Sequence, residues 1–99
     1  MSKYAKKTDA TQGIVVKILR ARGFQVHLLH ALGEGWPDLL ACRAGYCYWI
    51  EVKNPKAYKV DGSEGANTFT DAQKKFYSNW QGSKIHVIKS EQEAMDFMG

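Results

Sequence analysis

Apolar residues recur at helical spacing near the start of the chain. Residues 9–22 therefore predict an amphipathic helix, with Thr8 or Asp9 as its N-cap and Gly23 directly after it. Its apolar face carries Ile14, Val15, Ile18 and Leu19. Residues 1–7 precede this pattern, and we expect them to form a flexible N-terminus.

Alternating apolar and polar residues follow the helix. Residues 24–30 place Phe24, Val26 and Leu28 on one side, which predicts a strand with one apolar face that ends before Gly33-Glu34-Gly35. Residues 38–42 and 46–53 predict two further strands. The turn between them falls at Ala44-Gly45, so that we expect a β-hairpin.

The second half of the chain predicts a loop and three elements. Residues 54–67 lack hydrophobic periodicity, and we expect a mobile loop that grips substrate through Lys56 and Lys59. Residues 70–80 predict a helix that ends before Gly82 and buries Phe76, Trp80 and Ala72. A strand over residues 84–88 and a helix over residues 90–98 complete the order, and Ser90 and Glu93 stand at capping-box spacing.

The predicted order is α-β-β-β-α-β-α. It indicates an α/β fold, in which a mixed central sheet is flanked by helices. The 99 residues suit a single domain with room for one core and one site. Lys and Arg outnumber Asp and Glu by 14 to 10, and this net charge of +4 fits a polyanionic partner without requiring one.

The sequence shows no apolar run long enough to cross a membrane and no secretory signal after Met1, so we expect a cytoplasmic protein. Cys42 and Cys47 lack the second Cys or His pair of a structural zinc site, and we expect reduced thiols. His27, His30 and His86 stand at no recognised ligand spacing from them.

Candidate chemistry lies in the hairpin. A turn at Ala44-Gly45 pairs Cys42 with Cys47 and, further along, Asp38 with Glu51. Cβ atoms of directly opposed residues lie ~4.5–5.5 Å apart, and Lys53 shares a face with Glu51 because side chains two apart point the same way. Asp38, Glu51 and Lys53 are therefore expected to converge.

Two opposed carboxylates repel each other unless a cation lies between them. Mg²⁺ is the natural candidate because it prefers oxygen ligands and is held by one or two carboxylates together with substrate phosphates. The backbone carbonyl of Ile50 or Val52 could add a ligand. The alternative is a solvated cross-strand salt bridge. The Gly35-Trp36-Pro37-Asp38 turn and the apolar neighbours of Glu51 favour a site over that alternative.

Pro37-Asp38 followed by Ile50-Glu51-Val52-Lys53 resembles the PD-(D/E)XK nucleases, and most of all the stand-alone virus-type replication-repair (VRR-NUC) domain. The resemblance covers nearly the whole chain and implies a restriction-endonuclease-like core. It implies that Asp38 and Glu51 bind Mg²⁺, for which Mn²⁺ would substitute, and that Lys53 assists the nucleophile. It also implies a location in the cytoplasm of a bacterium or a phage-infected host.

Two glutamines belong to this comparison. The resemblance places Gln73 beside the site, whereas Thr70-Asp71-Ala72-Gln73 is also a capping box; the two interpretations are not exclusive. Many relatives carry an acidic site residue where this chain has Gln12, which could bind metal only through its amide oxygen. Gln12 could instead be the N3 capping partner of Asp9.

The resemblance implies a DNA endonuclease, with DNA repair as its setting and no small-molecule cofactor. Free-standing domains of this family resemble Holliday-junction resolvases, so we expect a homodimer that cuts four-way junctions. A flap, nicking or nonspecific nuclease is an alternative, as are a catalytically silent DNA-binding module and a protein-interaction domain. Trp36 could stack on unpaired bases, although core or dimer packing explains such aromatic residues more often.

Overall fold

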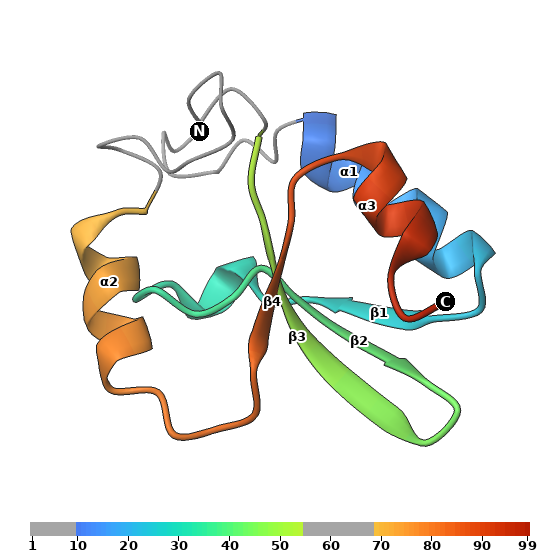
Figure 1. Cartoon of the computed structure of the whole chain (residues 1–99). Helices are drawn as coiled ribbons and strands as arrows, with labels where there is room; N and C mark the ends of the chain where they lie inside the picture. The colour runs from blue at the N-terminus through green and yellow to red at the C-terminus, as the bar shows by residue number, and fades with distance from the viewer. Residues whose placement is uncertain (1–9, 55–68) are drawn as a thin grey trace.

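The computed structural model describes residues 10–54 and 69–99. The loop expected over residues 54–67 and the N-terminal residues 1–7 fall almost entirely outside this range. The elements follow the predicted order, with one added 3₁₀ turn (Figure 1). They are α1 (Ala10–Ala21), β1 (Gln25–Leu28), η1 (His30–Leu32), β2 (Leu39–Arg43), β3 (Tyr46–Val52), α2 (Asp71–Ser78), β4 (Ile85–Ile88) and α3 (Glu91–Asp96).

The strands form a four-stranded mixed sheet in the order β1-β2-β3-β4. Neighbouring strands are antiparallel except β3 and β4, which run parallel and are connected through α2. The hairpin register is the predicted one, with Cys42 opposite Cys47. Ala44 and Gly45 both have positive φ, 54° and 86°, as the turns that match the twist of a hairpin require.

Helices cover both faces of the sheet (Figure 1). Helices α1 and α3 lie side by side over one face, and α2 lies on the other. The main core fills the space under α1 and α3 with Val15, Val16, Leu19, Phe24, Val26, Leu39, Ala41, Ile50, Val52, Ile88, Ala94 and Phe97. Because side chains alternate along a strand, Trp49 and Glu51 point to the opposite face, toward α2.

The α2 face has an aromatic cluster in place of an aliphatic core. The indole of Trp36 contacts the rings of Trp49, Phe76 and Trp80 with centroids 5.0–5.9 Å apart. The loop that carries Trp36 reaches α2 through Gly35, where a Cβ atom would lie 2.5 Å from the carbonyl oxygen of Ala72. This close approach, at a φ of 84°, requires glycine.

Of the two predicted capping boxes, the one at α2 is complete and the one at α3 is formed in part. At α2, the Thr70 hydroxyl accepts from the Gln73 amide and the Gln73 side chain accepts from the Thr70 amide, which completes the capping box. At α3, Ser90 caps the Glu93 amide, but the Glu93 carboxylate accepts from Lys89 instead of Ser90. The second capping box is therefore half formed, because the Lys89 side chain adds an ion pair at the same carboxylate.

Several local predictions were wrong. The first strand ends at Leu28, and His30 begins a 3₁₀ turn. Leu28 is 46% exposed because it ends an edge strand. Helix α2 ends before Gly82 as predicted, but its last residue is Ser78 instead of residue 80, and Ala72 is exposed. Phe76 and Trp80 are half-buried in the aromatic cluster.

The cysteines also differ from expectation. Cys42 and Cys47 form a disulfide across the hairpin, with their Cα atoms 4.0 Å apart. They are not free thiols, because the register places them directly opposite each other. In residues 10–54 and 69–99, none of the helices has the length and apolar character needed to cross a membrane.

Candidate active site

Asp38 is fixed at the start of the hairpin by two backbone contacts. Its carbonyl oxygen accepts from the Leu29 amide at 2.8 Å, which continues the pairing of β1 with β2 by one position. Its carboxylate oxygen Oδ2 accepts from the Val52 amide, also at 2.8 Å. The side chain of Asp38 thus lies across the end of β3, next to Glu51, as the predicted register requires.

Glu51 is the one charged residue in the buried interior of the described chain, with 2% of its surface exposed. Its Oε1 atom is buried and has no hydrogen-bond partner among the described residues. Burial and, second, the Asp38 carboxylate raise the pKa of Glu51 to about 8, against the Lys53 ammonium, which lowers it. Because Glu51 is buried, Asp38, Glu51 and Lys53 do not form a solvated salt bridge on the surface of the sheet.

The amide of Gln73 connects the site to α2. Its Nε2 donates to Glu51 Oε2 at 2.7 Å, and its Oε1 accepts from Lys53 Nζ at 2.8 Å. The same Oε1 accepts from the Thr70 amide at 3.0 Å in the capping box. The capping role and the position beside the site are therefore both present in one side chain.

Lys53 is held by three partners. Its Nζ lies 2.8 Å from Gln73 Oε1 and 3.5 Å from Glu51 Oε2, and it sits 4.7 Å from the centre of the Phe69 ring. With its side chain only 12% exposed, the ammonium is largely withdrawn from water and fixed in direction. Such a cation is placed to act on a group bound at the carboxylates.

A hollow of about 160 Å³ opens beside these groups. Its walls include Asp38 and Gln73, together with Thr70, His30 and Glu34. We call this space the active-site hollow. It gives a ligand access to Asp38, whereas the buried Glu51 is not among the residues that line it.

The residues present suit a hard divalent cation. Two carboxyl groups lie together, one with a buried oxygen that lacks a donor, and such a pair is relieved either by a proton or by a metal ion. Asp38 and Glu51 are the residues that would hold it. The described residues include no group of three or more His, Cys, Asp or Glu side chains that could hold a metal.

The other predicted site residues are less closely tied to this cluster. Trp36 lines the active-site hollow, but its ring contacts commit much of it to packing. Gln12 lies half-buried in the first turn of α1, and its metal-binding role stays a prediction. Val52 contributes its amide to Asp38, while the role of its carbonyl is untested. Lys56 and Lys59 lie outside the described residues.

Sequence reasoning missed two neighbours of the site. Phe69 stands directly before the capping box and places its ring under the Lys53 ammonium, a contact for which the sequence gives no signal. His30 lines the active-site hollow because the chain turns into η1 instead of extending β1. The alternating pattern had placed His30 at the end of the first strand, so no signal in the sequence indicated this position.

The chain has no match among protein-family models, curated protein sequences or solved structures.

Proposed function

We propose that this chain is a metal-dependent DNA endonuclease of the PD-(D/E)XK type, similar to VRR-NUC domains, that hydrolyses phosphodiester bonds. The observation that carries the proposal is the buried Glu51 carboxyl, which lies beside Asp38 and is bonded to Gln73 and Lys53. A buried acid with a raised pKa and a specific charged neighbour is typical of functional sites. A structural role would be filled with less cost by an apolar residue.

In this proposal each side chain has a distinct task. Asp38 and Glu51 hold Mg²⁺ or Mn²⁺, and Asp38 is kept in place by the Val52 amide. When bound there, the ion would polarise the scissile phosphate and lower the pKa of a water molecule. Lys53 orients the attacking water and offsets the negative charge that develops on the phosphoryl oxygens. Gln73 positions Lys53 relative to Glu51.

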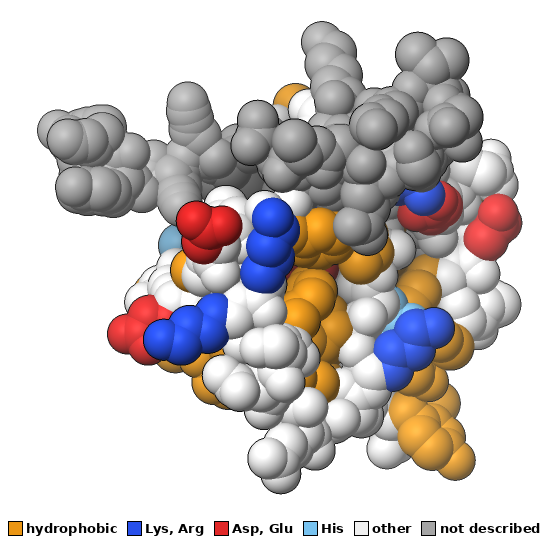
Figure 2. Space-filling view, turned by 60° about the vertical axis from the view of Figure 1, so that its left-hand side comes forward, with side chains coloured by type: hydrophobic (Ala, Val, Ile, Leu, Met, Phe, Trp, Pro, Cys, Tyr) orange, Lys and Arg blue, Asp and Glu red, His pale blue; other side chains and the backbone are white. Residues whose placement is uncertain are grey.

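DNA is the proposed substrate because the chemistry suits a phosphodiester and the chain carries a net charge of +4. The surface on the α2 side shows a strip of hydrophobic side chains with both positive and negative groups beside it (Figure 2). Among the described residues on this face, Lys and Arg side chains do not form a continuous basic track. We therefore propose selection by DNA structure, with four-way junctions as the first candidate and flaps as the alternative.

The decisive experiment is cleavage of junction, flap, duplex and single-stranded DNA by the purified protein with Mg²⁺, Mn²⁺ or EDTA. We expect metal-dependent cleavage that Asp38→Asn and Glu51→Gln each abolish while DNA binding persists. Glu91→Gln, which neutralises an exposed acid on α3, is the matched control and should cut normally. DNA binding without cleavage by the unaltered protein would instead identify a catalytically silent binding module.

The resolvase proposal adds a requirement for two sites, because paired cuts across a junction need two-fold symmetry. Light scattering at micromolar concentration, with and without junction DNA, should then detect a homodimer. A monomer on the junction, or equal cleavage of linear duplex, would remove the resolvase assignment and leave the nuclease assignment standing.

A further inference from the structure

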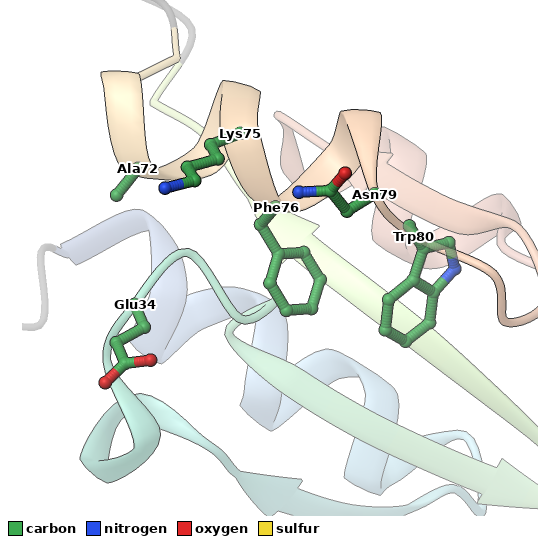
Figure 3. A pocket seen from close by; sticks show the side chains of 6 residues that line it. All are labelled: Glu34, Ala72, Lys75, Phe76, Asn79 and Trp80. Atoms are coloured by element: carbon green, nitrogen blue, oxygen red, sulfur yellow. The ribbon is translucent and has the colours of Figure 1, made fainter.

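A second pocket, of about 410 Å³, lies between α2 and the loop that follows η1 (Figure 3). Most of its lining comes from α2 and the residues directly after it, and Glu34 approaches from the loop on the other side. The lining residues are Glu34, Ala72, Lys75, Phe76, Asn79 and Trp80. We call this space the aromatic pocket.

The aromatic part of this pocket is rigidly supported. The rings of Phe76 and Trp80 stack with centroids 5.0 Å apart and an angle of 29° between their planes. Trp36 packs against both rings from the interior of the cluster, with centroids 5.0 Å and 5.9 Å away. Because their positions are set by this packing, the two rings present a preformed apolar surface to a flat ligand.

The polar part has the functional groups that a nucleotide requires. Lys75 supplies a cation for a phosphate, the Asn79 amide can both donate and accept, and the Glu34 carboxylate can accept from an exocyclic amine. All three side chains are exposed. In Figure 3, Lys75 and Asn79 extend from α2 and its end, and Glu34 extends from the loop on the other side.

The aromatic pocket adjoins the active-site hollow. Glu34 lines both spaces, and α2 borders both: Gln73 of its first turn faces the hollow, and Lys75, Phe76 and Asn79 follow along the pocket. A DNA strand whose phosphate lay at Asp38 would therefore have an adjacent nucleotide within reach of Phe76 and Trp80.

From these observations we infer that the aromatic pocket binds one unpaired nucleobase of the DNA strand that is cut. This inference rests on the proposed nuclease function and names the feature of the substrate that the protein selects. A base can enter such a pocket only when it is out of the duplex stack, which favours strands with an unpaired nucleotide at a branch or flap. Contact with aromatic side chains tolerates any base, because every base has a π face.

The test measures binding in EDTA, so that it does not depend on cleavage. A fluorescently labelled single strand and a fully paired duplex of the same sequence are titrated with protein and followed by fluorescence anisotropy. Asn79→Ala should weaken single-strand binding several-fold, as expected for the loss of one hydrogen bond to the base, and leave duplex binding unchanged. Gln81→Ala, which removes an exposed amide just beyond α2, is the control and should change neither.

Lys75 and Lys74 provide a second matched pair, since both are exposed lysines on α2 but only Lys75 lines the pocket. Lys75→Gln should weaken single-strand binding several-fold more than Lys74→Gln does. Equal losses from the two variants, on single strand and duplex alike, would mean that only net charge matters and would overturn the inference.

An abasic scan tests the pocket in the unaltered protein. Branched substrates carry one abasic nucleotide at successive positions near the cleavage point, and their binding is measured in EDTA. One position should lose about tenfold in affinity, and Asn79→Ala should reduce that difference because it removes the hydrogen bond to the base but leaves the rings in place. If cleavage is normal but an abasic nucleotide lowers affinity at none of the positions, the base-binding role of the pocket is wrong and the nuclease proposal stands. Pocket-dependent binding without any metal-dependent cleavage would overturn the nuclease proposal and retain the base-binding pocket.

Discussion

The Gln73 amide nitrogen donates to Oε2 of Glu51 at 2.7 Å, which joins the first turn of α2 to the buried acid of β3. This contact is unusual because the same side chain caps its own helix through Oε1. The geometry of the site is therefore coupled to the start of α2, and the two functions of Gln73 can be separated by substitution.

Thr70→Ala removes the hydroxyl that caps the Gln73 amide but leaves the Gln73 side chain in place. It should lower the free energy of unfolding by about 1 kcal/mol and change DNA cleavage little. Gln73→Ala should lower both stability and cleavage, because it also frees Glu51 and Lys53. Thermal unfolding and single-turnover cleavage measured on both variants test this. Equal cleavage by the two variants would reduce Gln73 to a helix cap.

Metal binding should compete with a proton on Glu51, because the pKa of Glu51 is about 8 in the metal-free protein. Affinity for Mn²⁺ should rise with pH by up to about tenfold per unit below that value and level off above it. Calorimetric titrations in buffers of different ionisation enthalpy would detect the released proton. Glu51→Gln should abolish both metal binding and proton release. An Mn²⁺ affinity that does not change with pH would contradict the assignment of Glu51 as a ligand.

The metal-free protein should lose stability as the pH rises. The folded state binds a proton on Glu51 with a pKa near 8, compared with an ordinary value of 4.5, so the folded state holds more protons between these values. The slope of stability against pH is then negative, and this contribution is lost as the pH passes through about 8. Denaturant unfolding in EDTA across this range should show the decline, and Glu51→Gln should flatten it.

Lys53→Met retains an apolar side chain beside Phe69 and removes the ammonium. We expect turnover to fall by about a hundredfold or more, as for other losses of a charge-stabilising donor, while DNA affinity changes little. Because Lys53 lowers the pKa of Glu51, the pH profile of cleavage should also move toward higher pH. Lys74→Met controls for the loss of one exposed charge on α2. Parallel losses of affinity and turnover would make Lys53 a binding residue.

Gln12→Glu tests whether the first turn of α1 contributes to the site. If this side chain reaches the metal bound by Asp38 and Glu51, the added carboxylate should tighten Mn²⁺ binding. Gly13→Glu adds the same charge at the next position, where a Cβ atom would meet nothing within 4 Å, and should leave the titration unchanged. Identical titrations for the two variants would return Gln12 to a role in the start of the helix.

Local patterns in the sequence were sufficient for the order of the elements and for the hairpin. The Ala44-Gly45 turn determines the register, which pairs Cys42 with Cys47 and Leu39 with Ile50. Continued by one position, the same register brings Asp38 next to Glu51. The Thr70–Gln73 capping box was predictable for the same reason, because its partners lie within one helical turn. The same register places Cys42 and Cys47 close enough for a disulfide, although we had expected reduced thiols.

Burial and long-range contacts were decided only by the tertiary structure. Glu51 is buried because α2 packs over its face of the sheet, and the contact with Gln73 joins residues 22 positions apart. Trp36 packs into an aromatic cluster, and Leu28 is exposed at the end of an edge strand. The alternation of apolar and polar residues does not predict either outcome, because both depend on which other elements lie nearby. A periodic pattern specifies which side chains share a face. The packing of other elements on that face decides whether it becomes part of the core, stays exposed to solvent or forms a site.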